Sequence, residues 1–287
     1  GPDKCLWYHR SFVLAPAWDK QRILLHFGAV DWDTRVWING HLVGTHQGGY
    51  DPFSFDITAT LKDDGPQDIV MRVWDPTDQN NAAQPRGKQV LRPGGIFYTA
   101  VTGIWQTVWL EPVPQSHIRS LKITPNIDLK MVTVEAAIAA QIEGLRLSVL
   151  SKQGWFRKIR TEVSAGQPAV LRIPKPKLWS PSKPFLYDLQ VVLKDAQGRV
   201  CDRVTSYFGM RKISLEEDAK GVNRLFLNNE PLFQFGPLDQ GWWPDGLYTA
   251  PTDEALCYDL EVTQKLGFNM LRKHVKTEPQ RLYYWCD

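Results

Sequence analysis

Short runs of alternating apolar and polar residues fill the first 113 positions of the chain. In residues 22–27, Ile23, Leu25 and Phe27 would share one face of an extended strand. Asn39-Gly40 separates two further runs, and this dipeptide strongly favours a two-residue hairpin turn. Similar alternation occurs in residues 68–74 and 104–110. Many short strands joined by turn residues predict a β-sandwich or a barrel. The polar loop 75–95 is long enough to suggest a functional role.

The next hundred residues repeat this pattern with a different set of strands. Residues 131–139, 187–193 and 200–208 are examples of about seven short runs, the number typical of an immunoglobulin-like sandwich. A proline-rich segment, 173–184, interrupts them, and proline cannot donate to a strand ladder. We therefore expect a crossing loop there.

The last quarter of the chain changes to a strand–helix–strand pattern. Apolar runs at 232–236 and 269–273 predict two parallel strands. Between them, leucines at steps of three and four predict a helix that begins near Thr252 and ends before Gly267. A second helix is predicted at 279–287, with its apolar residues exposed (Leu282, Tyr283, Tyr284 and Trp285). Because a parallel pattern that has just begun needs more sheet, we expect the chain to be the front part of a larger protein.

Composition excludes several classes of partner. The net charge is +3 and there is no run of lysines or arginines, so nucleic acid and membranes are poor candidates. No apolar run approaches the roughly 18 residues that span a bilayer. The four cysteines lack any metal-binding spacing and are expected to be free and mostly buried. The compartment and oligomeric state are left open by the sequence.

The order of these segments resembles the retaining β-glycosidases of glycoside hydrolase family 2, which include β-galactosidases, β-glucuronidases and β-mannosidases. The stretches that carry the resemblance are 6–10 (LWYHR), 36–40 (VWING), 48–58 (GGYDPFSFDIT), 102–110 (TGIWQTVWL), 178–181 (LWSP), 184–187 (PFLY), 208–211 (FGMR) and 226–231 (FLNNEP). The resemblance implies a mostly β, multidomain chain: a sugar-binding-type jelly roll in 1–113, an immunoglobulin-like sandwich in 114–214, and the truncated start of a TIM barrel in 215–287.

The family resemblance also implies an activity. Family members hydrolyse a β-glycoside with retention, using two glutamates about 5–5.5 Å apart. In the family these glutamates end the fourth and seventh barrel strands, whereas this sequence reaches the second. The catalytic pair is therefore expected beyond residue 287, and the 287 residues alone are expected to be inactive. The expected partner is a carbohydrate substrate; no cofactor and no metal are expected.

The same resemblance indicates candidate site residues. The family's Asn-x-x-Arg motif is present at 269–272, and it places Arg272 beside the nucleophile. His274 is one place earlier than the histidine of the family's Arg-x-Ser-His pattern, so it is a weaker candidate. The loop after the first barrel strand adds aromatic and acidic residues suited to hydroxyl-rich rings, namely Asp239, Trp242, Trp243 and Asp245.

For each candidate a structural role is the alternative. Arg272 could form an ordinary ion pair, His274 a structural hydrogen bond, and the tryptophans could wedge the barrel against the sandwiches. At the level of the whole protein, the alternatives are a non-catalytic carbohydrate-binding or adhesion protein and a pseudo-enzyme whose barrel lacks the glutamates. Asp31-Trp32-Asp33 suggests a sugar or ion contact, although an architectural role is more common for such a turn.

Overall fold

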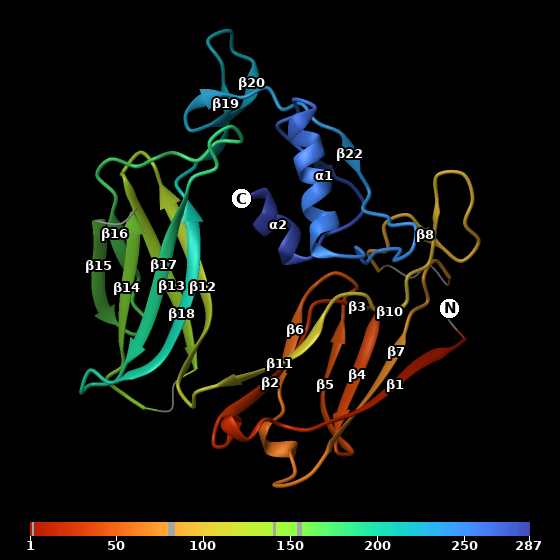
Figure 1. The fold of residues 1–287 in the computed structure, drawn as a ribbon. Helices are drawn as coiled ribbons and strands as arrows, with labels where there is room; N and C mark the ends of the chain where they lie inside the picture. Colours follow the sequence, from red (N-terminus) through yellow and green to blue (C-terminus); the bar gives the residue numbers. More distant parts are fainter. Residues whose placement is uncertain (2, 80–83, 140–141, 154–156) are drawn as a thin grey trace. The chain divides into compact units, whose positions relative to one another are not determined.

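The computed structural model describes the whole chain apart from residues 2, 80–83, 140–141 and 154–156. It has two compact units. The first combines Gly1–Val113 with Gly236–Cys286, and the second comprises Pro114–Phe235 together with Asp287 (Figure 1). Residues 215–235 thus group with the second unit and 236–286 with the first, and the three-domain division drawn from the sequence stays a prediction.

The first unit contains a sandwich of two antiparallel sheets. Their strand orders are β1-β7-β4-β5 and β11-β2-β6 (Figure 1). The strands are β1 (Cys5–Phe12), β2 (Arg22–Phe27), β4 (Asp33–Ile38), β5 (His41–Gln47), β6 (Phe53–Asp56), β7 (Gln67–Trp74) and β11 (Val108–Val113). Two short pairs lie beside them: β3 (Val30–Asp31) with β10 (Gly103–Ile104), and β8 (Gln89–Val90) with β9 (Tyr98–Thr99). Two 3₁₀ turns, η1 (Pro16–Trp18) and η2 (Thr58–Thr60), complete this part.

The alternation of apolar and polar residues in the sequence correctly predicts which side chains form the sandwich core. Ile23, Leu25 and Phe27 of β2 are buried together, as predicted. The Asn39-Gly40 hairpin is also confirmed, with positive φ at both residues. The prediction of one continuous strand over 104–110 is wrong. There β10 ends at Ile104 and β11 begins at Val108, because Trp105 turns inward and its Nε1 donates to the Gly49 carbonyl (2.7 Å).

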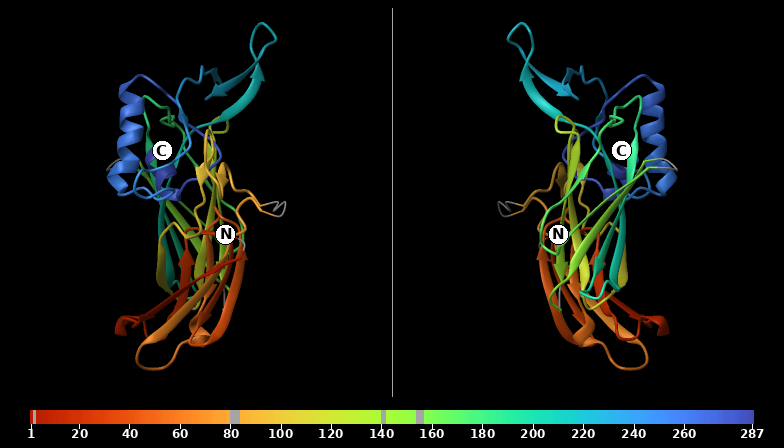
Figure 2. Two further views of the ribbon diagram at one scale, coloured as in Figure 1. Left: turned by 90° about the vertical axis from the view of Figure 1, so that its right-hand side faces the viewer. Right: turned by 90° about the vertical axis from the view of Figure 1, so that its left-hand side faces the viewer.

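In the residues that the structure describes, the second unit is a seven-stranded sandwich followed by a hairpin. Its sheets have the orders β12-β13-β16 and β15-β14-β17-β18. The strands are β12 (His117–Asn126), β13 (Met131–Ala139), β14 (Arg146–Gln153), β15 (Arg157–Ser164), β16 (Ala169–Arg172), β17 (Leu186–Lys194) and β18 (Val200–Gly209). The proline-rich segment 173–184 has no named strand, as predicted. Beyond the sandwich, β19 (Ile213–Glu217) and β20 (Asn223–Leu227) form a projecting hairpin that also pairs with β21 (Glu230–Pro231) (Figure 2).

Residues 236–286 form a short strand–helix–strand–helix segment of the first unit. Its elements are β22 (Leu238–Asp239), α1 (Asp253–Lys265), β23 (Arg272–Lys273) and α2 (Gln280–Cys286). The strands β22 and β23 pair in parallel. Thr252 caps α1 by accepting a hydrogen bond from the Ala255 amide (3.1 Å), which confirms the predicted start of the helix. Gly267, with a φ of +85°, follows its end.

Two predictions for this region, and one for the cysteines of the whole chain, need correction. The first parallel strand is Leu238–Asp239 rather than 232–236, and Phe233 is 80% exposed, so that apolar run does not enter a sheet. Leu282 of α2 is buried rather than exposed. The four cysteines are free in the described part of the chain, as expected, but none is fully buried. Among the described helices, none is both long and apolar enough to cross a membrane.

Candidate functional site

The parallel pair β22–β23 positions two residues on each of its faces. Leu238 lies opposite Arg272 in the register, and Asp239 lies opposite Lys273. Because side chains alternate along a strand, Leu238 and Arg272 share one face and Asp239 and Lys273 share the other. Leu238 is 52% exposed and Arg272 is also exposed, so their face is open. Arg272 therefore presents a cationic side chain on the uncovered face of this small sheet.

The other face of the pair carries a cluster of alternating charges. Lys273 Nζ lies 2.6 Å from Asp239 Oδ2 and 2.6 Å from Glu278 Oε1. Glu278 Oε2 in turn lies 3.1 Å from Lys276 Nζ. Asp239 also accepts from the Gly241 amide (2.7 Å), which fixes its carboxylate. These four charged groups neutralise one another, as charges removed from water must.

Lys276 is the most deeply buried member of this cluster. Its ammonium donates to the carbonyls of Gly241 (2.7 Å) and Tyr248 (2.8 Å). It also lies over two aromatic rings, 5.3 Å from the Trp105 centroid and 4.7 Å from the Tyr248 centroid. Burial lowers the pKa of Lys276, and the Glu278 carboxylate opposes this effect. Every proton of the ammonium thus has a partner, and this geometry indicates a structural role.

Tyr248 links this cluster to the jelly-roll sandwich. Its hydroxyl lies 3.1 Å from the Tyr50 hydroxyl and 3.4 Å from Gln89 Nε2. Gln89 Nε2 also lies 3.3 Å from Oδ2 of the buried Asp31. Burial, reinforced by the nearby Asp75 charge, raises the pKa of Asp31 to about 7. A chain of polar groups, most of them buried, therefore runs from β3 and β8, beside the sandwich, to the segment after β22.

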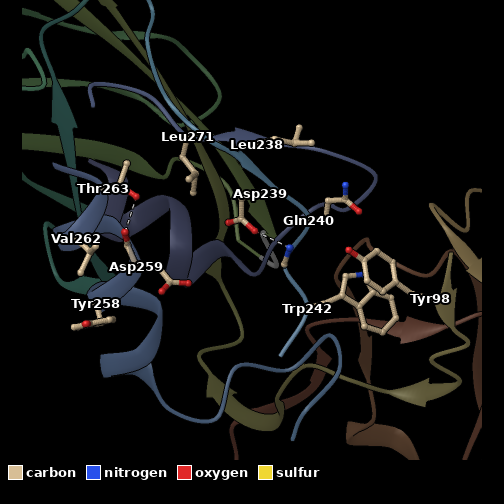
Figure 3. A pocket seen from close by; sticks show the side chains of 11 residues that line it. Tyr98, Leu238, Asp239, Gln240, Trp242, Tyr258, Asp259, Val262, Thr263 and Leu271 are labelled. Atoms are coloured by element: carbon tan, nitrogen blue, oxygen red, sulfur yellow. Dashed lines mark hydrogen bonds between the residues drawn. The ribbon is translucent and has the colours of Figure 1, made fainter. Parts of the chain in front are cut away.

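A pocket of about 460 Å³ lies beside β22 (Figure 3). Residues Leu238–Trp242 and Tyr98 line one side, and Tyr258, Asp259, Val262, Thr263 and Leu271 line the other. Tyr98 stacks on Trp242, with ring centroids 4.4 Å apart. Burial and the Asp239 charge raise the pKa of Asp259. Aromatic faces combined with carboxylates and an amide are groups that suit a polar, ring-shaped ligand.

Two buried polar atoms at this pocket lack a hydrogen-bond partner among the described residues. They are Gln240 Oε1 and Trp242 Nε1. Buried polar atoms are nearly always paired in folded proteins, so these two atoms are exceptions among the residues that line the pocket. Within the described residues, no group of three or more His, Cys, Asp or Glu side chains is arranged to hold a metal ion.

Two family models match the chain in consecutive segments. "Glycosyl hydrolases family 2, sugar binding domain" matches residues 3–111, and "Glycosyl hydrolases family 2" matches residues 116–211. The chain belongs to glycosyl hydrolase family 2. The predicted resemblance is thus confirmed, and the first match covers the jelly-roll sandwich while the second covers the immunoglobulin-like one.

Curated relatives within this family are larger than the present chain. A β-galactosidase of Thermoanaerobacter pseudethanolicus is 27% identical over 237 residues, which cover 79% of this chain and 30% of the relative. A putative β-glucuronidase of Formosa agariphila is 28% identical over 292 residues, covering 98% of this chain and 26% of the relative. The chain therefore spans less than a third of the length of either protein.

Solved structures of family 2 share the fold. The crystal structure of a β-glucuronidase from Ruminococcus gnavus superposes with a TM-score of 0.81 at 19% identity, over 99% of this chain and 47% of that one. A family 2 member from Bacteroides cellulosilyticus gives 0.78 at 20% identity, over 98% and 38%. At sequence identities this low, the similarity shows a shared fold and nothing more.

The structure separates the six residues that the family resemblance singled out. Asp239 and Trp242 meet at the pocket. Arg272 lies on the open face of the parallel pair, and the His274 amide donates to the Asp239 carbonyl (2.9 Å) at the end of β22. Trp243 pairs through its backbone with Leu247, and Asp245 is exposed in the loop between them.

Several residues of this region were missed by the sequence reasoning. The charged partners Lys273, Lys276 and Glu278 were not singled out, and neither were Tyr98 and Tyr248. A signal existed for the lysines and the glutamate, since they lie close together in the sequence at a predicted strand end. The two tyrosines come from segments with no recognisable pattern, so only the fold reveals their position.

Proposed function

We propose that this chain forms the N-terminal part of a family 2 enzyme that hydrolyses the O-glycosidic bond of a β-linked sugar with retention. The observation that carries this proposal is the open face of the β22–β23 pair. There, Arg272 lies on a strand of a parallel pair that follows, after the hairpin, the two sandwiches that match the family. A lectin built from the sandwiches would have no use for this parallel pair.

In the proposed enzyme Arg272 acts on the nucleophilic carboxylate. A fixed guanidinium within a few ångströms of a carboxylate favours its ionised form and so lowers its pKa. Retaining hydrolysis needs that ionised form, because the carboxylate attacks the anomeric carbon while a second, protonated carboxyl group donates to the leaving oxygen. We assign neither carboxylate to a residue of this chain, and we expect the 287 residues alone to be inactive.

The charge cluster on the opposite face supports Arg272 in this proposal. Lys273, the neighbour of Arg272, is held by Asp239 and Glu278, both at 2.6 Å. Such a double anchor limits the movement of the strand that carries the arginine, and active sites need their groups positioned within about 0.5 Å. His274, which is fixed to β22 through its backbone, is proposed to stand at the same edge.

The proposed substrate is a β-glycoside, and the relatives named above are described as a β-galactosidase and a β-glucuronidase. Asp239, Trp242, Trp243 and Asp245 are proposed to contribute to substrate binding or to its support. Of these four residues, Asp239 and Trp242 line the pocket that also contains Tyr98. The sugar is not identified by these residues.

Two matched assays test the proposal. The complete product of the gene and the 287-residue chain would be incubated with 4-nitrophenyl β-galactoside and β-glucuronide, with the anomer first released followed by proton NMR. We expect turnover with β-anomer formation from the complete product and none from the 287 residues. Absence of turnover by the complete product on a wider panel of β-glycosides would favour the non-catalytic carbohydrate-binding alternative, and release by the short chain would refute its predicted inactivity.

A further inference from the structure

The outer face of the sheet β1-β7-β4-β5 carries two tryptophans that the proposed activity does not use. In this sheet the row Tyr8–Met71–Val36 packs into the sandwich core. Side chains alternate along each strand, so the neighbouring positions Trp7 and Trp37 point away from that core. Trp7 is 62% exposed, an unusual state for so large an apolar side chain.

The two indole rings form a stacked pair on this face. Their centroids are 5.9 Å apart and their planes differ by 25°. Trp7 and Trp37 come from β1 and β4, which are separated by β7, so the pair covers the intervening strand near Val70. A flat aromatic surface fixed in this way presents the apolar area against which the C–H face of a sugar ring packs, at a low cost in side-chain entropy.

Two arginines and a histidine lie beside the tryptophan pair. Arg72 lies between Trp7 and Arg35 in the same cross-strand row. Arg35 is exposed, and within the described part of the chain it has no ion-pair partner. His9 occupies the next row, beside Trp37 across Val70. The face therefore offers hydrogen-bond donors and positive charge immediately beside its aromatic surface.

The carboxylates on this face are already engaged. Asp33 accepts from Gln47 Nε2 (2.7 Å) and lies 3.8 Å from Arg72 Nη1. Asp68 accepts from Ser11 Oγ (2.7 Å) and lies 3.3 Å from His9 Nε2. Both carboxylates already have partners, whereas Arg35 has no ion-pair partner among the described residues. A ligand at this face would therefore meet the positive charge of Arg35.

We propose that this face binds a glycan chain that contains uronic acids. One sugar ring would pack on the exposed indole of Trp7, and a carboxylate of the glycan would bond to Arg35. The match of residues 3–111 to a sugar-binding domain model supports the class of ligand but assigns no residues to it. The site is separate from the open face of β22–β23, and the proposal does not depend on hydrolysis.

Two other occupants fit the face less well. A protein partner would need a larger apolar centre than this face offers. Among the described residues its apolar strip consists of Trp7, Trp37 and Leu42, and arginines, acids and amides surround it. A nucleic acid would need several unpaired cationic side chains to bind its phosphates. In the described part of this face, Arg35 is the arginine without an ion-pair partner.

The test compares binding to two polymers that share a β-1,4-linked glucan backbone. Isothermal titration calorimetry would use the 287-residue chain with β-1,4-polyglucuronate and with neutral hydroxyethyl cellulose. We expect the chain to bind the polyuronate, to bind the neutral polymer more weakly, and to lose affinity as salt is added. Trp7→Ala and Arg35→Gln should each weaken polyuronate binding by about tenfold.

A matched variant controls for the loss of an exposed tryptophan. Trp109 is 44% exposed on the other sheet of the sandwich, where it stacks on His26 at 4.8 Å. Trp109→Ala should leave polyuronate binding unchanged, and all variants should keep the thermal unfolding temperature of the parent chain within a few degrees, about the effect of a surface substitution.

Any of the following results would overturn the proposal. If the parent chain does not bind polyuronate, or if Trp7→Ala and Arg35→Gln bind as the parent does, the face is not the site. Equal affinity for the neutral polymer would refute the role of Arg35. Tighter binding of single-stranded DNA than of polyuronate would assign the face to nucleic acid instead.

Discussion

Lys276 and Glu278 form a buried ion pair, with Nζ and Oε2 3.1 Å apart and side chains 0% and 2% exposed. The pair joins Trp105 of the jelly roll, over whose ring Lys276 lies, to Lys273, which neighbours Arg272 along β23. Through this pair the sandwich and the start of the parallel sheet are linked within one compact unit. The sandwich thereby supports the strand on which the proposed active-site arginine stands.

Removing one partner of this pair should be strongly destabilising. Lys276→Met leaves the Glu278 carboxylate without one of its two cations, and we expect the free energy of unfolding to fall by about 3–5 kcal/mol. Urea unfolding followed by tryptophan fluorescence measures the change. The control is Lys265→Met, which breaks an exposed pair with Glu261 (3.4 Å) and should cost about 0.5 kcal/mol. Equal effects of the two variants would show that the buried pair has no special role.

Gly241 should not tolerate a side chain. Its φ is +65°, and a Cβ there would meet Glu278 Oε1 and the Lys276 side chain. Gly65 has a similar φ of +78° with open space around it, so Gly65→Ala isolates the conformational cost of a positive φ. We expect Gly65→Ala to cost about 1 kcal/mol and Gly241→Ala about 1–3 kcal/mol more. Thermal unfolding of both variants checks this, and similar costs would mean that the cluster rearranges freely.

Asp31 should make stability depend on pH. Its pKa is about 7 in the folded chain, whereas an unperturbed aspartate has a pKa of 3.8. Between these values the folded state holds a proton that the unfolded state has lost, so the stability that this proton contributes is fully present below about pH 4 and is lost as the pH rises to about 7. Asp31→Asn removes this titration while preserving the shape of the side chain.

The measurement for Asp31 is the free energy of unfolding of the parent chain and of Asp31→Asn across this pH range. We expect the variant to gain stability relative to the parent by a few kcal/mol between about pH 4 and about pH 8. A difference between the two proteins that stays constant with pH would show that Asp31 titrates normally in the fold.

The N-cap of α1 should contribute to the stability of that helix independently of the charge cluster around Lys276. Thr252 Oγ1 accepts from the Ala255 amide, so Thr252→Ala should lower stability by about 1 kcal/mol. Thr252→Ser retains the acceptor and should lose far less. Hydrogen exchange should show the α1 amides best protected in the parent chain, slightly less in Thr252→Ser and least in Thr252→Ala. Equal protection in the two variants would contradict the assigned cap.

Local patterns made part of this fold predictable. Asn39-Gly40 and Thr252 each act within a few residues, so the sequence is sufficient to place the hairpin turn and the start of α1. The alternation of Ile23, Leu25 and Phe27 likewise fixes which side of β2 faces the core. These features depend on backbone preferences and periodicity, which a single sequence contains.

The parts that could not be predicted depend on distant partners. The apolar run 232–236 suggested a strand, but the parallel ladder starts at Leu238, which pairs with Arg272. Lys276 and Glu278 are ordinary surface residues by type, and only their contacts with Trp105 and with each other explain their burial. Family resemblance identified Arg272, whereas the lysines of the charge cluster became visible with the fold.

The proposed role of Arg272 is tested most directly by Arg272→Gln in the complete product of the gene. Arg272 is exposed on the open face of β22–β23, so the variant should fold with unchanged stability. Arg119→Gln, at an exposed arginine of the second sandwich, is the matched control. We predict that Arg272→Gln lowers kcat for an aryl β-glycoside by about 10²-fold and raises the pKa of the acidic limb of the pH–rate profile. A kcat within about twofold of the control, with an unshifted profile, would contradict the account.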